Sequence, residues 1–400
     1  MDSLTQIVLG ASVGEAALGR KVGNRAMVWG AIAGTIPDLD VISNGFMSPI
    51  DALAFHRGPT HSALYLTLFA LILGWSVHFL YTLKWHKWLG IIGWSILILA
   101  TSGAIAFMGQ MSLNKGLIAA GILCGAGFLV FKRYFRSSYD SPTASVKDWQ
   151  MMFFLSLVTH PILDCFTTYG TQILIPFSGI RVAFNNIAVA DPLYTVPFLI
   201  CLLVAMGFNK SNKKRRFWNN VGLIISSIYM IFTIFNKFNI NTIFEKSLQA
   251  NNISYSRYMT TPTILNNILW TGIAESDTAY FYGTYSHFDA EPLFEIKSIG
   301  KNRVAFGNVL DTDSTLKTLR WFSDDYFQLK QKSGDTLEYY DLRFGTFKMK
   351  ASDPDQFVFK FNLYKDAASH YILKDQGERP RDADFGDVFA ALWNRIMGRK

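Results

Sequence analysis

Histidine is scarce in this chain, and the histidines that stand out lie in short motifs rich in polar residues. Two of the seven histidines in the 400 residues lie in the stretch HRGPTHS, residues 56–62. His160 and Asp164 are four residues apart, so a helix would place them one turn apart on the same face. Imidazole nitrogens and carboxylate oxygens bind zinc and other first-row metals. These residue types and spacings predict a metal site.

Two further aspartates lie in the motif IPDLD, residues 36–40. Pro37 disfavours helix for the residue before it, and an extended backbone would project Asp38 and Asp40 to the same side. The complete set of predicted ligands is Asp38, Asp40, His56, His61, His160 and Asp164. This set suffices for one divalent ion or two. Its mixture of nitrogen and oxygen favours Zn, Mn or Fe, with Zn or Mn first, over Mg or Ca, which prefer oxygen alone.

Two residues beside these motifs have side chains that suit catalysis. Arg57 stands next to a predicted ligand, and its planar guanidinium group could hold a phosphate. Asp191, in the stretch ADPLYT, could serve as a general base, and Asp40 is the other candidate for that role. Arg181 is a second candidate for phosphate binding. The ordinary alternative for both arginines is contact with lipid headgroups.

The segments that carry these residues are predicted to be membrane helices. Half of the residues are hydrophobic and only 17% are charged, whereas soluble domains have about 25% charged residues. A membrane helix needs roughly 20 apolar residues. The expected spans are 26–43, 62–83, 89–108, 113–132, 151–170, 192–208 and 217–236, with 4–19 as a weaker eighth. The predicted fold is therefore an α-helical multi-pass membrane domain with seven to eight spans, over residues 1–240.

Lysine and arginine predict the orientation of these spans. If each segment crosses the membrane, fourteen Lys and Arg residues fall in loops on one face and three in loops on the other. Cytoplasmic loops are enriched in Lys and Arg, so the predicted metal-binding motifs lie on the extracytoplasmic face. The basic pI of about 9.2 arises largely from these loops, which argues against nucleic-acid binding.

The chain changes character after the last apolar segment. Residues 245–400 form the second expected domain, which is small, β-rich and extracytoplasmic. The stretch 326–344 reads as two strands around a Ser-Gly-Asp turn, and 356–364 alternates apolar and polar residues as a half-buried strand does. The tail 384–400 has the apolar spacing of an amphipathic helix.

The motifs, in their order along the chain, resemble a known family. The start MDSLTQIVLG, then IPDLD, HRGPTHS, HPILDCFTTYGT and ADPLYT, is similar to the YdjM-type family of predicted inner-membrane metal-dependent hydrolases. The resemblance covers roughly residues 1–240. It implies a multi-pass protein of the bacterial inner membrane in which the six predicted ligands bind metal. Many members have Thr-His where this chain has Thr5-Gln6, so the site either lacks one ligand or uses the carbonyl oxygen of Gln6.

The expected function is metal-dependent hydrolysis at the outer membrane–water interface. The position of the site at the membrane rim favours a phosphate-containing lipid or a lipid-linked substrate, and the sequence specifies no protein partner. Each motif alone also has a structural explanation, such as a hydrogen bond between helices, a helix cap or a polar loop. The alternatives for the whole protein are a divalent-metal transporter and a non-catalytic membrane protein with a structural metal site.

Overall fold

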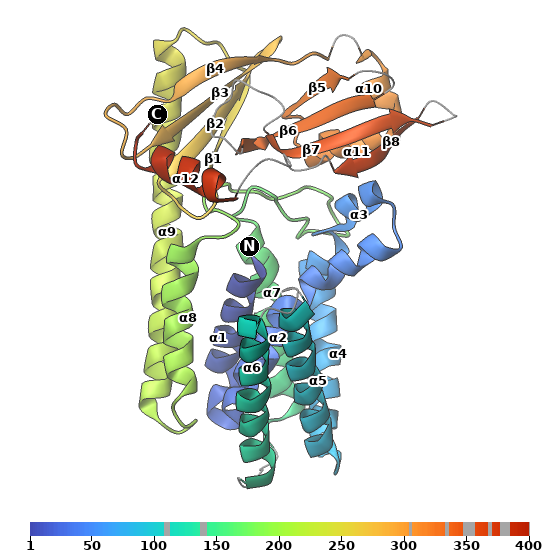
Figure 1. Cartoon of the computed structure of the whole chain (residues 1–400), viewed down its shortest axis with the longest axis vertical. Helices are drawn as coiled ribbons and strands as arrows, with labels where there is room; N and C mark the ends of the chain where they lie inside the picture. Colours follow the sequence, from blue (N-terminus) through green and yellow to red (C-terminus); the bar gives the residue numbers. More distant parts are fainter. Residues whose placement is uncertain are drawn as a thin grey trace.

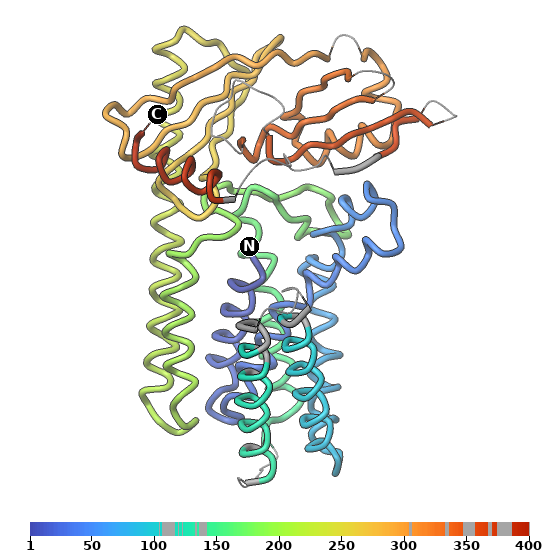
Figure 2. Tube along the Cα trace, in the orientation of Figure 1, coloured from blue at the N-terminus to red at the C-terminus, as the bar shows by residue number. Residues whose placement is uncertain are grey.

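A helical part and a β-rich part lie end to end in the computed structural model (Figure 1). The structure describes residues 1–400 except 108–112, 137–141, 304–305, 333–335, 347–356, 367–369, 377–384 and 400. In the trace of Figure 2 the helices run roughly side by side, and both sheets sit at one end of them. The sequence predicted this change from helices to strands, and the β-rich C-terminal part is confirmed.

The first two helices form a tight hairpin because small residues line their contact. Helix α1 (Ser3–Val22) carries Gly10 and Gly14, and α2 (Asn24–Thr35) carries Gly30 and Gly34. A Cβ atom on any of these four glycines would collide with the backbone of the opposite helix. Small residues four apart let two helix backbones approach closely. This approach brings the start of α1 and the end of α2 to one end of the helical part.

The segment after α2 leads back to a long apolar helix. It contains the 3-10 helix η1 (Pro37–Gly45), the short helix α3 (Pro49–Phe55) and the 3-10 turn η2 (Pro59–His61). Helix α4 (Ala63–Thr82) follows, capped by the side chain of Ser62. Helix α7 (Val146–Asp164) packs along α4 and against α1. Their core includes Trp149, Phe153 and Leu157, all fully buried.

The remaining helices flank this group. Helices α8 (Pro192–Met206) and α9 (Lys213–Ala250) form a second hairpin, and α9 continues upward along the first sheet (Figure 1). Helices α5 and α6 pair with each other. Helix α5 spans His86–Phe107, and α6 spans Leu113–Phe131. The π-helical turn η3 (Lys132–Arg136) follows α6 directly.

The prediction of seven to eight membrane spans is wrong. In the part of the chain that the structure describes, two helices are long and apolar enough to cross a membrane, Ala63–Thr82 and Lys213–Ala250. The expected span 26–43 is divided between α2, which has 12 residues, and η1, because Pro37 follows directly after α2. In the expected span 192–208 the helix has only 15 residues. In the expected span 151–170 the helix ends at Asp164, six residues before the predicted end. Parts of 89–108 and of the loop 109–116 lie outside the described residues.

The β-rich part contains two four-stranded antiparallel sheets, each a simple meander. The orders are β1-β2-β3-β4 and β5-β6-β7-β8. The first sheet comprises Arg257–Pro262, Leu269–Glu275, Ala279–Ser286 and Glu295–Gly300. The second comprises Phe327–Gln331, Thr336–Thr346, Phe357–Lys365 and Tyr371–Gln376. Three helices accompany them, α10 (Val309–Thr312), α11 (Ser314–Phe322) and α12 (Phe385–Ile396). Strands β5 and β6 occupy the predicted pair, and the predicted Ser-Gly-Asp turn lies outside the described residues.

Each sheet is attached to the helical part by a hydrophobic cluster. The first sheet packs on the upper half of α9, where Phe244 and Leu248 meet Trp270. The second sheet and α11 pack on α3, where Ile50 and Leu53 join a core that includes Phe322. The β-rich part therefore lies directly over the segment that carries the motifs IPDLD and HRGPTHS.

Candidate metal centre

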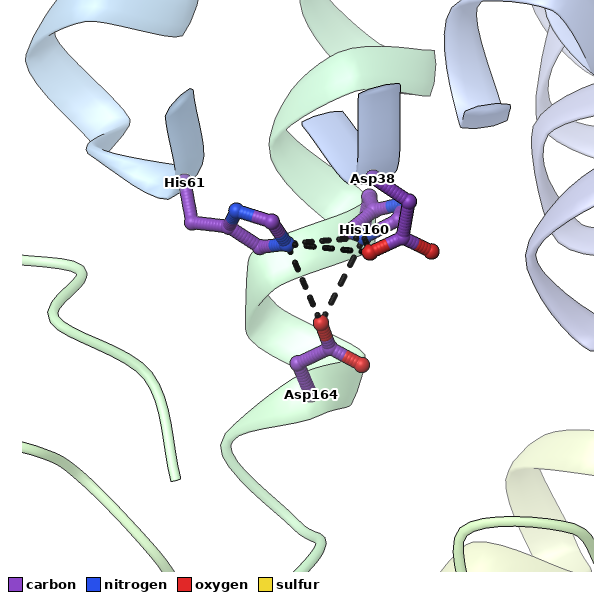
Figure 3. Close-up of side chains that lie close together, drawn as sticks. All are labelled: Asp38, His61, His160 and Asp164. Atoms are coloured by element: carbon purple, nitrogen blue, oxygen red, sulfur yellow. Dashed lines mark hydrogen bonds and ion pairs between the residues drawn. The ribbon is translucent and has the colours of Figure 1, made fainter. Parts of the chain in front are cut away.

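Four side chains from three segments converge on one point (Figure 3). They are Asp38 from η1, His61 from η2, and His160 and Asp164 from the last turn of α7. The Nε2 atoms of His61 and His160 are 3.2 Å apart. Each of these nitrogens is 3.4 Å from Asp38 Oδ1 and 3.4 Å from Asp164 Oδ2. The side chains of His61, His160 and Asp164 are buried, and that of Asp38 is partly exposed.

The four atoms form the corners of a tetrahedron. Five of its six edges are 3.2–3.4 Å long, and the sixth, between the two carboxylate oxygens, is at most 4.8 Å. The centre of such a tetrahedron lies about 2.0–2.4 Å from every corner, which overlaps the lengths of zinc–nitrogen and zinc–oxygen bonds. The size of the cluster is therefore right for a first-row metal with these four atoms as ligands.

One buried atom of the cluster has no hydrogen-bond partner. Asp164 Oδ2 is inaccessible to solvent and accepts no hydrogen bond among the described residues. An unpaired buried carboxylate oxygen costs several kcal/mol unless a cation balances it. The residues present therefore fit a divalent ion, with two imidazole nitrogens and two carboxylate oxygens as its donors.

The outer nitrogens of both histidines are held by neighbours. His160 Nδ1 lies 2.7 Å from the carbonyl oxygen of Gly34, and His61 Nδ1 lies 3.1 Å from Thr60 Oγ1 and 3.6 Å from Asp40 Oδ2. Such contacts place the ring proton on Nδ1 and leave the lone pair of Nε2 free for a metal. The orientation of the rings is thus set before any ion binds.

Asp40 and His56 lie beside the cluster and bond to each other. Asp40 Oδ1 is 2.8 Å from His56 Nδ1, and Asp40 Oδ2 accepts bonds from the backbone N–H of Arg57 and from the hydroxyl of Thr60. Burial favours the neutral acid, but the hydrogen bonds, that from His56 foremost, hold the pKa of Asp40 below its ordinary value. The structure therefore places these two predicted ligands around the cluster, where they support His61.

Asp38 is ionised for a related reason. Burial opposes the charge on this carboxyl, yet hydrogen bonds from His160 and His61 hold its pKa below the ordinary value. An anionic carboxylate is the form that binds a metal. Asp38 is also the most accessible member of the cluster, with a side chain that is 19% exposed.

Arg57 lies next to the cluster in an unusual backbone conformation. Its φ is 58°, a left-handed value that costs free energy for a residue with a side chain. Its Nε is 3.4 Å from Asp164 Oδ2, and its Nη1 donates to Thr167 Oγ1 at 3.1 Å. Nε has no hydrogen-bond partner in the part of the chain that the structure describes. The guanidinium group is therefore buried beside the metal position, where it can face an anion.

Two groups near the start of the chain also reach Asp164. The side-chain nitrogen of Gln6 donates to Asp164 Oδ1 at 3.0 Å, and its Oε1 is buried without a partner among the described residues. The amino group of Met1 contacts the same Oδ1. Gln6 stands where the resemblance places a histidine, and the structure puts it within hydrogen-bond distance of a candidate ligand.

Asp191, the predicted base, and Arg181, the second predicted phosphate-binding residue, lie outside the cluster. Asp191 caps helix α8 by accepting bonds from the backbone N–H groups of Leu193 and Tyr194, and it also accepts the hydroxyl of Tyr229. Burial raises the pKa of Asp191, against the effect of these hydrogen bonds. Arg181 donates to the carbonyl oxygens of Phe322 and Tyr169. Neither residue belongs to the group of converging metal ligands.

Sequence reasoning missed three contributors to this region. The hydroxyl of Thr60 donates to Asp40. Tyr169 has the guanidinium groups of Arg57 and Arg181 at 4.8 and 4.7 Å from its ring centre. The carbonyl of Gly34 orients His160. Thr60 lies in the motif HRGPTHS and Tyr169 in HPILDCFTTYGT, so their positions in the sequence could have suggested a role at the site. The role of a backbone carbonyl cannot be predicted from residue type.

Comparison with known proteins gives one match. A family model described as YdjM inner membrane protein matches residues 1–240, which include the whole cluster. The searches of curated proteins and of solved structures found no match.

Proposed function

Since the chain belongs to the YdjM inner membrane protein family, we propose that it is a membrane-bound metal-dependent hydrolase. The observation that carries this proposal is the tetrahedral cluster of Asp38, His61, His160 and Asp164 with its unpaired carboxylate oxygen. Zn²⁺ is the ion that this donor set and size favour, and Mn²⁺ is the second. A bound ion of this kind supplies Lewis acidity toward a phosphoryl oxygen and toward water.

The side chains around the cluster each have a role in this proposal. Arg57 holds an anionic group of the substrate beside Asp164, because its Nε is buried and no described residue forms a hydrogen bond with it. Asp40 and Thr60 keep the ring of His61 in place. Asp38, the partly exposed member, stands on the side from which water reaches the cluster. A substrate with a phosphate next to the scissile bond suits this combination of a metal and an arginine.

The location of the cluster supports a substrate that resides in the membrane. His61 lies two residues before Ala63, where the candidate span α4 begins. The cluster therefore lies at the end of a span, where headgroups of lipids would be. We propose a phosphate-containing lipid or a lipid-linked phosphate ester as the substrate.

The charges at the opposite end support an extracytoplasmic β-rich part. Helix α9 begins with Lys213, Lys214, Arg215 and Arg216. The Nζ of Lys210 donates to the backbone of Lys21 at the same end of the helices. Figure 1 shows that the lower ends of α4 and α9 lie away from the two sheets. Because basic residues favour the cytoplasmic side, this charge distribution supports an extracytoplasmic position for the cluster and the sheets. Fusion of a periplasmic reporter enzyme to the C-terminus is expected to give activity, and a cytoplasmic reporter in that position is expected to be inactive.

One observation favours a second function. Four protein donors around one point complete a tetrahedral shell, and closed shells are typical of structural zinc sites. In that case the ion would stabilise the junction of η1, η2 and α7, and the protein would not catalyse hydrolysis. The two functions differ in whether the site leaves a position for water, as catalytic zinc sites do and structural ones do not.

Hydrolysis by the purified protein in bilayers tests the proposal. The protein is loaded with Zn²⁺ or Mn²⁺ and incubated with phospholipids and polyprenyl phosphates, and released phosphate or alcohol is measured. We expect product with the wild type and with His370→Ala, a control at an exposed histidine, and none with His61→Ala or Asp164→Ala. A metal-loaded wild type that is inactive on the whole panel would favour the structural role.

A further inference from the structure

A cavity of about 180 Å³ lies next to the metal cluster, between the helical part and the second sheet. One wall is polar and consists of Asp40 and His56, and the rest is mostly apolar, with Val41, Leu53 and Phe359 among its residues. Asp40 Oδ2 is 3.6 Å from His61 Nδ1, and the rings of His56 and His61 are 6.1 Å apart. The polar wall of the cavity is therefore directly behind one of the candidate metal ligands.

We propose that this cavity binds the apolar chain of the substrate, adjacent to its phosphate. This inference rests on the proposed hydrolase function and names the part of the substrate that the cavity selects. The phosphate itself belongs at the guanidinium group of Arg57, which lies 4.8 Å from the ring centre of the cavity-lining Tyr169, because the Asp40 carboxylate would repel it from the cavity. An alkyl or isoprenyl chain has the polarity of the remaining walls.

The mouth of the cavity supports an apolar chain as the occupant. Val41 lines the cavity and is also 52% exposed, so the cavity continues into the outer surface of η1. On that surface Leu39, Ile42 and Phe46 are exposed as well, Phe46 at 74%. Exposed apolar side chains next to the start of the span α4 are expected to lie in the membrane interface. A lipid chain could thus pass from the bilayer over η1 into the cavity without crossing water.

The wall opposite η1 comes from outside the region that matches the family. Phe359 belongs to β7, beyond residues 1–240, and its ring packs 4.5 Å from that of Phe344. Leu53 and Phe359 both pack against the hydrophobic cluster that joins α3 to the second sheet. The family-matching part thus provides the metal cluster and most of the cavity, and the C-terminal part completes the cavity with Phe359.

A series of alkyl p-nitrophenyl phosphates tests the role of the cavity. Water attacks phosphorus, the bond from phosphorus to the p-nitrophenyl oxygen breaks, and the products are an alkyl phosphate and p-nitrophenol. Each buried methylene contributes about 0.8 kcal/mol, so we expect kcat/KM to rise by up to about 4-fold per methylene from the methyl towards the octyl ester. Phe359→Trp, which fills the cavity, should lower kcat/KM much more for the octyl ester than for the methyl ester and so abolish this rise.

The control is Val358→Trp, because Val358 is the exposed neighbour of Phe359 on the same strand. It should retain the chain-length dependence. Phe359→Leu, which enlarges the cavity, should shift the preferred chain to a longer one. Thermal unfolding and metal content are measured for each variant. Equal kcat/KM for the methyl and octyl esters in the wild type, or equal losses for both in Phe359→Trp, would overturn the proposal.

A binding experiment separates failure of the cavity from failure of the hydrolase. Octylphosphonate and methylphosphonate, which are not hydrolysed, are titrated into the zinc-loaded protein. Tighter binding of the octyl compound that Phe359→Trp abolishes would support the cavity even if no ester is turned over, whereas equal binding would overturn it. Dodecyl phosphate and farnesyl phosphate then compete in the same assay, and the tighter of the two identifies an acyl-type or an isoprenyl chain.

Discussion

The helical part buries ionisable groups at both of its ends, and the two sets differ in how their charges are balanced. At the end away from the sheets, Glu15 and Arg215 form a buried pair. Arg215 Nε donates to Glu15 Oε1 at 2.6 Å, and Nη2 donates to the other carboxylate oxygen. The remaining guanidinium nitrogen donates to Asn24 and to the carbonyl of Phe208. Every charged group of this set is paired within the chain.

In the second set, beneath the sheets, the charged groups are not all hydrogen-bonded to one another. Asp38, His61, His160 and Asp164 direct four potential donor atoms at one point, and Asp164 Oδ2 accepts no hydrogen bond from any residue that the structure describes. Arg57 and the amino group of Met1 bring positive charge to Asp164, but neither donates to that oxygen. The comparison shows why one buried cluster reads as structural and the other as a binding site. The first set is a closed ion pair, whereas the second directs two imidazole nitrogens and two carboxylate oxygens at one point, as the ligands of a cation do.

Removal of two ligands should have the largest effect. The double variant His61→Ala/His160→Ala should lose about 5–8 kcal/mol of metal-binding free energy, half of the ~10–16 kcal/mol that structural zinc sites provide. Metal content, measured by mass spectrometry of the purified protein, should fall from about one ion per chain to none. Retention of a stoichiometric ion by this variant, with His370→Ala as the matched control, would place the metal elsewhere.

Breaking the closed pair should destabilise the protein without affecting the metal. Arg215→Met leaves the Glu15 carboxylate buried and unpaired, which costs about 3–5 kcal/mol. Glu15→Leu/Arg215→Met removes both charges and should regain most of that stability. The measurement is the thermal unfolding midpoint in detergent together with metal content. If Arg215→Met loses its metal and keeps its stability, the Glu15–Arg215 pair supports the metal site, and the conclusion that it is a separate structural pair is wrong.

A change beside the cluster should have an intermediate effect. Asp40→Asn keeps the shape of the side chain but removes the charge that faces His61 Nδ1 and His56 Nδ1. Loss of a group that orients a metal ligand reduces metal affinity by about 10–100-fold, which corresponds to about 1.4–2.8 kcal/mol. Competition with a chelator gives the affinity. A loss as large as that of Asp38→Asn would instead identify Asp40 as a ligand.

The sequence predicted the convergence of distant motifs better than it predicted the elements that carry them. His160 and Asp164 are on one helix face because α7 is regular up to Asp164. Asp38 and Asp40 diverge because their backbone is a 3-10 helix, with three residues per turn, and not the extended strand that would align them. The pattern of residues near Pro37 did not distinguish these two conformations.

The number of spans was overestimated because apolar content reports burial in lipid and burial in protein alike. In α1 and α2 the glycines serve a close contact between helices, and the apolar residues beside them pack on α7 and α8. The cavity under β7 had no sequence signal, since Phe359 and Leu53 are 306 positions apart and either could belong to an ordinary core. Contacts of this kind depend on how the two parts of the chain dock.

The smallest effect concerns Asp191, which the hypothesis from sequence treated as a base. Burial raises its pKa above the ordinary 3.8, so folding disfavours the ionised form of this carboxyl. Stability from this group is therefore present at pH values below 3.8, and it is lost as the pH rises through the higher pKa of the folded state. Asn and Asp are nearly equal helix caps, so Asp191→Asn should keep the bonds to Leu193 and Tyr194 and change stability by less than about 1 kcal/mol. The variant should gain stability over the wild type at neutral pH and lose that advantage in acid, as thermal unfolding at several pH values would show. Hydrolysis should persist in this variant, whereas its abolition with unchanged stability and metal content would restore Asp191 as a catalytic base.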